Sequence, residues 1–553
     1  KILSATSFYS YFLAVSRWAG AALCLLLVLT WLRYYFSARG GRQVFAELLT
    51  PDGRSLPVRF LESVLGRGGR ADLVIPSAGV KRRHAVLYAD DGQWILAPAE
   101  GRVAVNRQNL SQPAPVYYGD KITIGGCTLT FKQHRAVEDM SSNKPAGPVP
   151  CLWLLTAFQL LLGVQVWLFS GTVKTVPVYA PTLFLGLAAL QWVYYLVGRR
   201  LKGFKMLMEL PVFYLASLGL TLCCYDFPKR LSKQVLCILA GLLGYLLFTL
   251  LLKRFPARIV LQRLVMAGSL ALLYLTALFG SEINSSRNWL VIGPVSFQPS
   301  ELCKAAFIFA GCAALYTVVL RKGRQLEFTF YAVLCMGALA LMLDFGAVAI
   351  FFVGMLTLLC LRLVSPWVTG GICVLFGGVG ITVLAVYPYI ARRFAVWLHA
   401  WQYADSTGYQ QTRTMIASAS GGLLGVGPGN GYLSAVSAAE TDLVFGVVFE
   451  ELGGIIALVA ALCFVALGVY AYRLGKNASS LFYTCGVCTA AVMLLFQSAL
   501  NIFGSLDLLP LTGVTLIFVS CGGTSVIAAW LMLAFFKAAE LAHPPVDGWR
   551  EYE

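Results

Sequence analysis

The chain has 553 residues, of which 58% are hydrophobic and only 12% are charged, and its mean hydropathy is +0.73. Soluble domains usually contain about 25% charged residues, so this composition excludes an ordinary soluble protein and indicates a polytopic membrane protein. The net charge of +17 does not indicate nucleic-acid binding, because Lys and Arg lie in short loops between apolar runs, where they orient a membrane protein. Fifteen Cys, mostly inside apolar runs, and four His predict neither a disulfide framework nor a His-based metal centre.

The first apolar run, from about Trp18 to Phe36, predicts a transmembrane anchor within residues 1–37. Arg33, Arg39 and Arg42 follow at its C-terminal end. Because basic residues flank a span on the cytoplasmic side, this end is expected to face the cytoplasm. No small-residue cleavage site follows the run, which favours an anchor over a cleaved signal peptide.

The next region, residues 38–135, is polar and consists of short alternating segments such as RQVFAEL, ADLVIP and KITIGGCTLTF. Gly, Pro and Asp break these segments, which is typical of an all-β sandwich. We expect this sandwich to be cytoplasmic. A linker at 136–150, containing SSNKPAGPVP, separates it from a multi-span membrane domain at 151–553.

Apolar runs of spanning length fill the membrane domain, and about twelve helices of about 20 residues are expected. Hydropathy places their centres roughly near residues 160, 190, 215, 243, 270, 310, 335, 355, 378, 458, 492 and 525. Basic clusters at 198–205, 253–263, 321–324 and 472–476 predict cytoplasmic loops and a cytoplasmic C-terminus. The segment SSRNWLVIGPVSFQPSE and a long loop at 387–441 then fall on the outer face. One outer segment, FPKRLSKQ, is more basic than this topology predicts.

The stretch RNWLVIGPVSFQPSELCK, residues 287–304, is the first polar island in this apolar domain. Pro299 and Glu301 suit the first turn of a helix, so capping alone explains part of it. Lys304 follows Glu301 by one turn, and such a pair at membrane depth must face a wet cavity or each other. The alternative is therefore that the stretch walls an outward-facing groove, with Arg287 and Trp289 at its rim.

A second island, MLDFGAVAI, contains Asp344, the only ionisable residue between Glu327 and Arg362. A lone carboxylate at the outer end of an apolar helix either reaches the membrane interface or acts as a general base. Both interpretations remain open from the residues alone.

The long outer loop and the C-terminal spans carry the remaining islands. The run SGGLLGVGPGNG offers backbone amides to an anion, although a glycine-rich loop alone is weak evidence. Glu450 and Glu451 are expected to pair with Lys or Arg from another helix. The hydroxyl residues of PLTGVTLIFVSCGGTS suit ligand contact and tight helix packing equally well.

Four ordered motifs, RNWLVIG with QPSELCK, LDFGA, GGLLGVG to TDLVFGVVFEELG, and PLTGVTLIFVSCGGTS, resemble the SEDS family of RodA and FtsW type. The resemblance covers about 151–537. It implies a helical membrane bundle and a peptidoglycan glycosyltransferase that polymerises lipid II on the outer face of the bacterial cytoplasmic membrane, beside a class B penicillin-binding protein. It also implies that Asp344 is catalytic. The sequence departs from the family at Met342, Leu343 and Ala347, where Gln, Pro and Thr are usual, and two spans before the first motif exceed the usual number.

The motifs and islands together predict a substrate site. Cations among its residues, Arg287, Lys304, Arg392 or Arg393, are expected to neutralise the diphosphate of lipid II. A divalent cation, Mg²⁺ or Mn²⁺, is the cofactor considered, without assigned ligands. The predicted substrate-binding residues are Arg287, Trp289, Gln298, Ser300, Glu301, Lys304, Arg392, Arg393, Gln410, Gly421, Gly422, Thr441, Asp442 and Ser520.

The polar region resembles a forkhead-associated (FHA) domain through LGRGGRADLVIP, VKRRHAVL and YGDKITIG. Such domains bind phosphothreonine peptides through the Arg of the GR pair, here Arg67, and a Ser that is here Lys81. Arg67, Lys81 and Arg82 form a predicted cationic rim that suits a phosphoprotein ligand. A phosphate-independent protein contact is the alternative.

Two other functions remain open for the whole chain. A flippase of a lipid-linked precursor would show similar intramembrane charges, but it needs polar residues along the inner half of its helices, where Glu209 is one of few. A catalytically weak scaffold would recruit a phosphorylated partner through the FHA domain and dock a transpeptidase.

Overall fold

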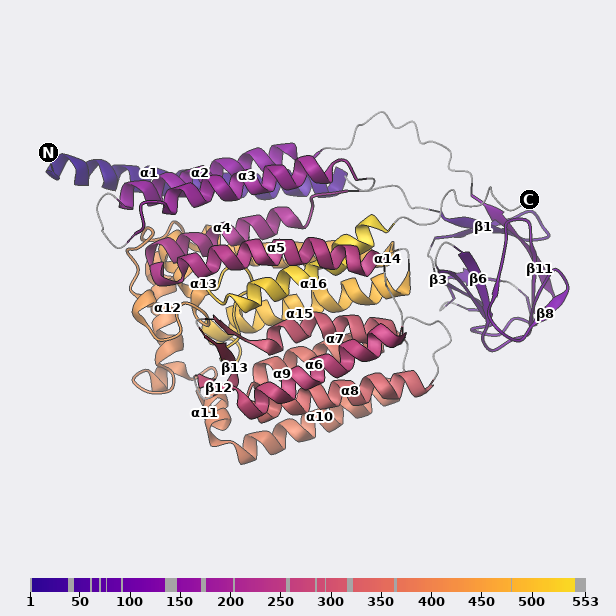
Figure 1. Ribbon diagram of the computed structural model, residues 1–553. Coiled ribbons are helices and arrows are strands. Elements are labelled where there is room, and N and C mark those ends of the chain that lie inside the picture. The colour runs from indigo at the N-terminus through magenta and orange to yellow at the C-terminus, as the bar shows by residue number, and fades with distance from the viewer. Residues whose placement is uncertain are drawn as a thin grey trace.

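The computed structural model describes two structural units, a β-sandwich and a helical bundle (Figure 1). The described residues are 2–37, 44–59, 62–68, 71–75, 77–90, 93–134, 147–170, 176–201, 204–254, 259–283, 286–293, 295–315, 322–362, 366–478 and 480–542. Most of the predicted linker at 136–150 lies outside them.

The predicted all-β sandwich is confirmed between residues 46 and 133. One sheet has the order β2-β1-β11-β10-β7-β8 and the other β4-β3-β5-β6-β9. Apolar side chains alternate with exposed ones, and Trp94 meets Phe131 across the sheets with ring centroids 5.7 Å apart. The strands are β1 (Ala46–Leu49), β2 (Ser55–Val58), β3 (Glu62–Gly66), β4 (Leu73–Val74), β5 (Ala85–Asp90), β6 (Gln93–Pro98), β7 (Val103–Val105), β8 (Gln108–Leu110), β9 (Ala114–Pro115), β10 (Lys121–Ile124) and β11 (Cys127–Gln133).

Each predicted span centre falls inside a helix of the bundle. Within the described residues, nine helices, α1 included, are long and apolar enough to cross a membrane, and α4 and α9 are shorter apolar helices. The helices at the predicted centres are α2 (Val149–Ser170), α3 (Ala180–Gly198), α4 (Glu209–Tyr225), α5 (Leu231–Arg254), α6 (Ile259–Phe279), α7 (Pro299–Leu315), α8 (Lys322–Leu341), α9 (Phe345–Leu361), α10 (Pro366–Val386), α14 (Gly454–Lys476), α15 (Leu481–Ser505) and α16 (Thr524–Leu541).

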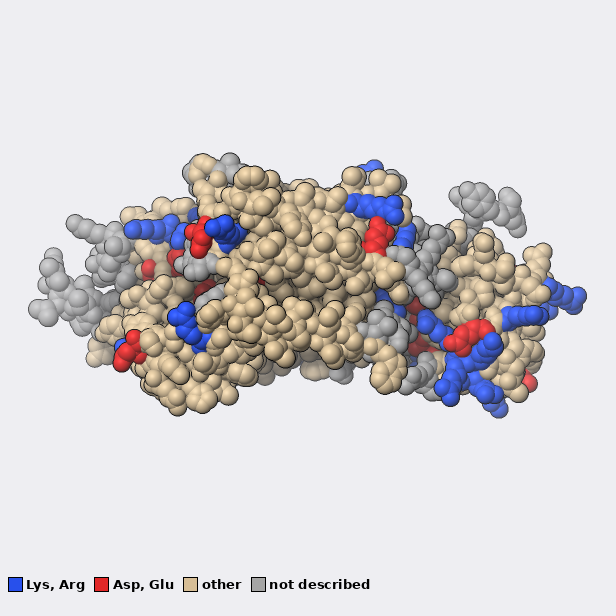
Figure 2. Space-filling model, turned by 90° about the horizontal axis from the view of Figure 1, so that it is seen from below, with Lys and Arg blue, Asp and Glu red and all other residues tan. Residues whose placement is uncertain are grey.

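The bundle has two distinct ends (Figure 1). At the end away from the sandwich, here called the hairpin end, lie the strands β12 (Ser281–Ile283), β13 (Ser286–Ile292) and β14 (Val295–Phe297) and the helices α11 (Pro388–Val396), α12 (Tyr409–Gly421) and α13 (Val444–Leu452). Charged side chains gather toward both ends in Figure 2, and the face between them is almost free of charge. This apolar belt is what a protein that crosses a bilayer requires.

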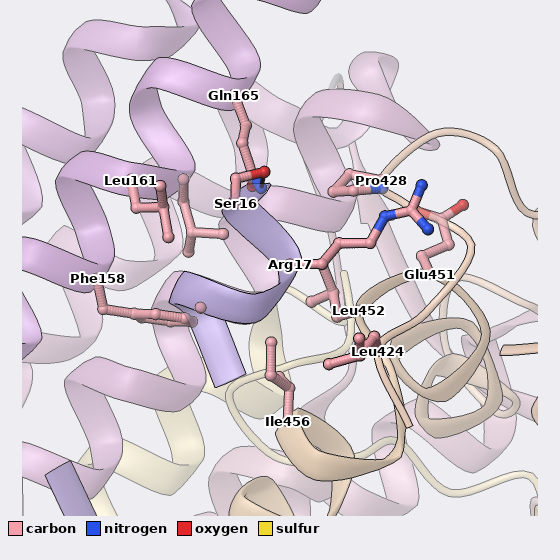
Figure 3. A pocket seen from close by; sticks show the side chains of 12 residues that line it. Ser16, Arg17, Phe158, Leu161, Gln165, Leu424, Pro428, Glu451, Leu452 and Ile456 are labelled. Atoms are coloured by element: carbon pink, nitrogen blue, oxygen red, sulfur yellow. Dashed lines mark hydrogen bonds between the residues drawn. The ribbon is translucent and has the colours of Figure 1, made fainter. Parts of the chain in front are cut away.

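The N-terminal helix α1 (Ile2–Ser37) packs along α2 and α14, so it is an integral part of the bundle. Arg17 Nη1 donates to Gly425 O at 3.0 Å, next to a cavity of about 20 Å³ that Glu451 also lines (Figure 3). Farther along α1, Trp31 Nε1 donates to Leu207 O at 2.8 Å. Helix α1 thus contacts the long loop from about its middle and the residues just before α4 near its C-terminal end.

Candidate active site

The first motif forms a three-stranded antiparallel hairpin in the order β12-β13-β14. Two bonds to the carbonyl of Met342 fix this hairpin at the end of α8: the Arg287 amide donates at 3.1 Å and the Ser286 hydroxyl at 3.0 Å. The hairpin therefore lies directly against the residues that precede Asp344.

Asp344 is the N-cap residue of α9, and its carboxylate accepts three hydrogen bonds. Oδ1 accepts from the Ala347 amide at 3.0 Å, while Oδ2 accepts from Asn288 Nδ2 at 2.8 Å and Gln298 Nε2 at 3.3 Å. Asp344 remains half-buried. Because the donors come from a helix end and from both sides of the hairpin, the carboxylate is held in one orientation at the hairpin end.

Asp442 is a second carboxylate close to Asp344. Burial raises its pKa to about 6 and the charge of Asp344 adds to the increase, while Thr441 and Arg393 act in the opposite direction. Asn501 Nδ2 donates to the carbonyls of Thr441 and Asp442 at 3.3 and 3.1 Å. Asn501, in α15, therefore fixes the segment before α13 beside Asp344.

Ser520 and Gly346 bring the last motif to the same place. The Ser520 hydroxyl donates to Thr441 O at 2.8 Å and accepts from the Leu516 amide at 2.9 Å. A Cβ on Gly346 would lie 2.7 Å from Val514, so the turn after Asp344 packs closely under this motif. All four sequence motifs meet at the hairpin end.

Glu301 and Lys304 face each other in α7. Lys304 Nζ lies 2.6 Å from Glu301 Oε1 and 2.7 Å from Gln497 Oε1, and its side chain is 0% exposed. The ammonium has no exposed surface to offer a ligand. We therefore assign this pair to joining α7 and α15, and not to direct contact with the diphosphate.

The other predicted cations and the glutamine lie on the surface. Arg287 and Arg392 are exposed, and Arg287 Nε lies 3.5 Å from Glu282. Arg393 Nη1 donates to Leu511 O at 3.2 Å, and Gln410 Nε2 donates to Ser437 O at 2.9 Å. Of these, Arg393 is placed near the carboxylates, because its charge acts on Asp442.

The glycine-rich loop binds protein carboxylates. Glu451 accepts from the amides of Gly429 and Gly431 at 2.8 and 3.2 Å, and Glu450 accepts from those of Tyr432 and Leu433, both at 3.0 Å. The predicted pairing of both glutamates with Lys or Arg is therefore wrong, since amides of the loop fill that role.

Gly421 and Gly422 have structural reasons for being glycine. A Cβ on Gly421 would lie 2.4 Å from Phe449 O in α13. Gly422 ends α12 with φ of 55°, which glycine adopts without strain. These two positions therefore hold α12 against α13, and the structure explains them without a ligand.

Three polar residues at the site were not predicted as site residues: Asn288, Lys233 and Thr524. Asn288 has the shortest side-chain bond to Asp344, and Thr524 Oγ1 accepts from the Gln298 amide at 3.2 Å. Lys233 Nζ donates to Ser296 Oγ and O at 3.2 and 3.3 Å. The one sequence signal for Lys233 was the excess positive charge of FPKRLSKQ.

The cationic rim of the sandwich is exposed. The Arg67 amide donates to Lys81 O at 2.9 Å, which brings together the loops that carry Arg67, Lys81 and Arg82. His84 is buried, and its Nδ1 accepts from the Lys81 amide at 3.0 Å. His84 thus supports the loop from below, and the three cationic side chains stay available.

Comparison with known proteins assigns both units. The family model described as a cell cycle protein of FtsW, RodA and SpoVE type matches residues 200–540, more than half of the chain. The chain belongs to the FtsW/RodA/SpoVE family. An FHA domain model matches residues 63–125. The helices α1 to α3 lie before the FtsW/RodA/SpoVE match.

Curated relatives and a solved structure agree with this family assignment. The probable peptidoglycan glycosyltransferase FtsW of Nitrosococcus halophilus is 34% identical over 292 residues, covering 50% of this chain and 74% of the relative. That of Coxiella burnetii is 32% identical over 267 residues, covering 47% and 72%. A chain from a peptidoglycan synthase complex that coordinates polymerization and crosslinking is 26% identical with a TM-score of 0.51, covering 60% of this FtsW/RodA/SpoVE protein and 96% of that chain.

Proposed function

We propose that the protein is a peptidoglycan glycosyltransferase that polymerises lipid II at the hairpin end, on the outer face of the bacterial cytoplasmic membrane. The observation that carries the proposal is the convergence of all four family motifs around the hydrogen-bonded carboxylate of Asp344. The relatives' names support the activity. The basic loops at the sandwich end support a cytoplasmic position for the FHA domain and the C-terminus.

In the proposed reaction the 4-hydroxyl of one lipid-linked disaccharide attacks C1 of a second glycan. The hydroxyl proton passes to Asp344, the C1–O bond to the diphosphate breaks, and undecaprenyl diphosphate leaves. A positioned general base contributes about 10² to 10⁴ in rate. Asn288 and Gln298 keep the carboxylate oriented toward the incoming hydroxyl.

The test incubates the purified protein with labelled lipid II, alone and with a class B penicillin-binding protein, and resolves the products by length. Asp344→Asn is expected to lose about 10² to 10⁴ in rate, because the amide does not accept the proton. Asp405→Asn, which changes an exposed carboxylate at the same end, is expected to keep the parent's rate. A fully active Asp344→Asn variant would refute the assignment.

We include a divalent cation in this proposal only as an ion that binds together with the substrate. Asp344 and Asp442 lie close enough to influence one another, and Mg²⁺ is commonly bound by one or two carboxylates plus substrate phosphates. The described residues contain no group of three or more His, Cys, Asp or Glu that would hold an ion alone. Both carboxylates fit such an ion, which would supply positive charge to the leaving diphosphate.

The FHA domain is proposed to bind a phosphothreonine peptide through Arg67, Lys81 and Arg82. Arg67→Ala is expected to weaken binding of a phosphothreonine peptide about tenfold or more, because a charge-assisted hydrogen bond is lost. Arg54→Ala, an exposed arginine elsewhere on the sandwich, serves as the control in a calorimetric titration. Equal binding of phosphorylated and unphosphorylated peptide would favour a phosphate-independent contact.

The geometry around Glu209 disfavours the flippase alternative. Glu209 is fully buried, lies 2.7 Å from Lys537 Nζ, and accepts from the hydroxyls of Tyr194 and Tyr245. Glu209 is therefore engaged by protein groups and has no exposed surface to offer a transported lipid.

A further inference from the structure

Lys233 lies in the first turn of α5, at the hairpin end, and reaches toward the candidate site. Its ammonium bonds both oxygens of Ser296 in β14 and lies 5.8 Å from the centroid of the Trp289 ring in β13. The side chain is half-buried. Within the described residues, no carboxylate pairs with this ammonium, in contrast to Lys304 and Lys537. Among the residues that the structure describes, no ion pair therefore compensates its positive charge.

The start of α16 lies directly beside Lys233. A Cβ on Gly523, the N-cap residue of α16, would lie 2.9 Å from Lys233 Cε and 3.7 Å from Nζ. The lysine therefore passes so close to this helix end that a side chain there would displace it. Helix N-termini carry a partial positive charge, which adds to that of the lysine.

The start of α7 meets the start of α16. The amide of Gln298, directly before α7, donates to Thr524 Oγ1, the first residue of α16. Ser300 and Ser525, the second residues of the two helices, are 1% and 3% exposed, and their hydroxyls have no partner among the described residues. The starts of α7 and α16, each with an unpartnered buried hydroxyl at its second residue, thus lie next to residues that Lys233 contacts, Ser296 and Gly523.

This cluster also lies next to Asp344, the proposed general base. The side chain of Gln298 donates to Asp344, and its backbone N–H donates to Thr524 Oγ1. One residue therefore separates the carboxylate from the cationic cluster. Gln298 would thus lie between Asp344 and an anion bound at the cluster. Glycosyl transfer needs this separation, because the base acts on the hydroxyl of the acceptor while the diphosphate leaves C1 of the donor.

We infer that Lys233, with the N-termini of α7 and α16, forms a diphosphate-binding subsite for a polyprenyl diphosphate. The inference rests on the proposed function for its substrate class, and it names a residue that neither the motifs nor the comparisons assign. The subsite holds the diphosphate of the glycosyl donor and, after transfer, of the leaving polyprenyl diphosphate.

The first experiment measures protection of lysines in the full-length protein by mass spectrometry after brief acetylation in detergent. Undecaprenyl diphosphate is the probe, with undecaprenyl phosphate and undecaprenol as comparison lipids. Lys233 is expected to be protected about tenfold by the diphosphate and less by the other two lipids. Lys229, exposed four residues earlier, is expected to be acetylated equally in all three. Equal acetylation of Lys233 with and without the diphosphate would overturn the inference.

The second experiment compares Lys233→Gln, Lys233→Arg and the control Lys229→Gln, each checked for an unchanged thermal midpoint. Lys233→Gln is expected to bind undecaprenyl diphosphate about 10- to 100-fold more weakly and to raise the KM for lipid II, because a charge-assisted bond is lost. Lys233→Arg is expected to restore most of the affinity. A folded Lys233→Gln variant with the parent's affinity would overturn the subsite.

The two proposals fail in distinguishable ways. If the parent makes glycan chains but the diphosphate does not protect Lys233, the subsite is wrong and the glycosyltransferase assignment stands. If the diphosphate protects Lys233 but no chains form, the subsite stands and the assignment of the reaction fails.

Discussion

Leu343, the residue before Asp344, has φ of 60°, in the left-handed region that residues other than glycine rarely adopt. The FtsW/RodA/SpoVE motif usually has Pro at this position, and Pro requires φ near −65°. The Leu343 amide also donates to Ala340 O at 3.0 Å, a bond that Pro cannot make. The backbone that presents the carboxylate therefore differs from what the family's residue would permit.

Restoring the family's residue is consequently expected to damage this protein. Leu343→Pro should lower the stability by about 3 kcal/mol and abolish polymerisation, because both the φ angle and the amide donor are lost. Leu343→Ala keeps the donor and should retain activity. Thermal melting in detergent and the lipid II assay measure both variants; a stable, active Leu343→Pro variant would contradict this account.

Asp442 predicts how stability depends on pH. Its pKa is raised to about 6 from the usual 3.8, so the folded state binds a proton more tightly than the unfolded state does. The stabilisation by this proton is complete below about pH 4 and is lost as the pH rises through 6. Asp442→Asn does not titrate, so its stability relative to the parent should increase by on the order of 2 kcal/mol between pH 4 and 7. Parallel melts of the exposed Asp405→Asn variant should follow the parent throughout.

At the scale of elements, α7 contains the buried Glu301–Lys304 charge pair, and Lys304 also joins α7 to α15 by its hydrogen bond to Gln497. Lys304→Met leaves the Glu301 carboxylate buried without its cation and should destabilise the protein by about 3–5 kcal/mol. The double variant Glu301→Gln, Lys304→Met removes both charges and should recover much of the loss. The folded yield and melting of a fluorescent fusion test this, and a double variant no better than the single one would show that the pair itself is not the cause.

The elements differ in how far the sequence could predict them. The span centres could be predicted because the length and hydropathy of each apolar run decide whether it enters the membrane, independently of its neighbours. The contacts of Asn288 and Lys233 were not, because their partners lie 56 and 63 residues away and no local pattern encodes them. The pairing of Glu450 and Glu451 was mispredicted for a related reason: backbone amides carry no sequence signature, so only side-chain cations were considered.

At the scale of the whole molecule, the sandwich contacts the bundle through Glu62 and Arg362. Arg362 Nη1 lies 3.5 Å from Glu62 Oε2, and burial raises the pKa of Glu62, while Arg362 opposes the increase. Glu62→Arg should weaken this contact by on the order of 1 kcal/mol, and the exchange Glu62→Arg, Arg362→Glu should restore it. Hydrogen exchange of β3 measures the effect; unchanged exchange in Glu62→Arg would show that the contact does not hold the sandwich.

Composition predicted both units, but not their contact, because an ion pair between residues 300 positions apart appears in the sequence only as two ordinary charges. Membrane hydropathy and β alternation are local signals, whereas docking depends on which loop ends meet after folding.

Helix α9 lies between its N-cap residue Asp344 and its C-cap residue Arg362, and its 17 residues form a rod of about 25 Å. One rigid element therefore has the Asp344 carboxylate at one end and the contact with the FHA domain at the other. Thermodynamic linkage makes any coupling between two binding sites reciprocal. Suppose that a bound phosphopeptide changes the contact of the sandwich with Arg362 and thereby the affinity for lipid II. Bound lipid II must then change the affinity for the phosphopeptide by the same factor. The FHA domain would then respond to the supply of substrate on the other side of the membrane.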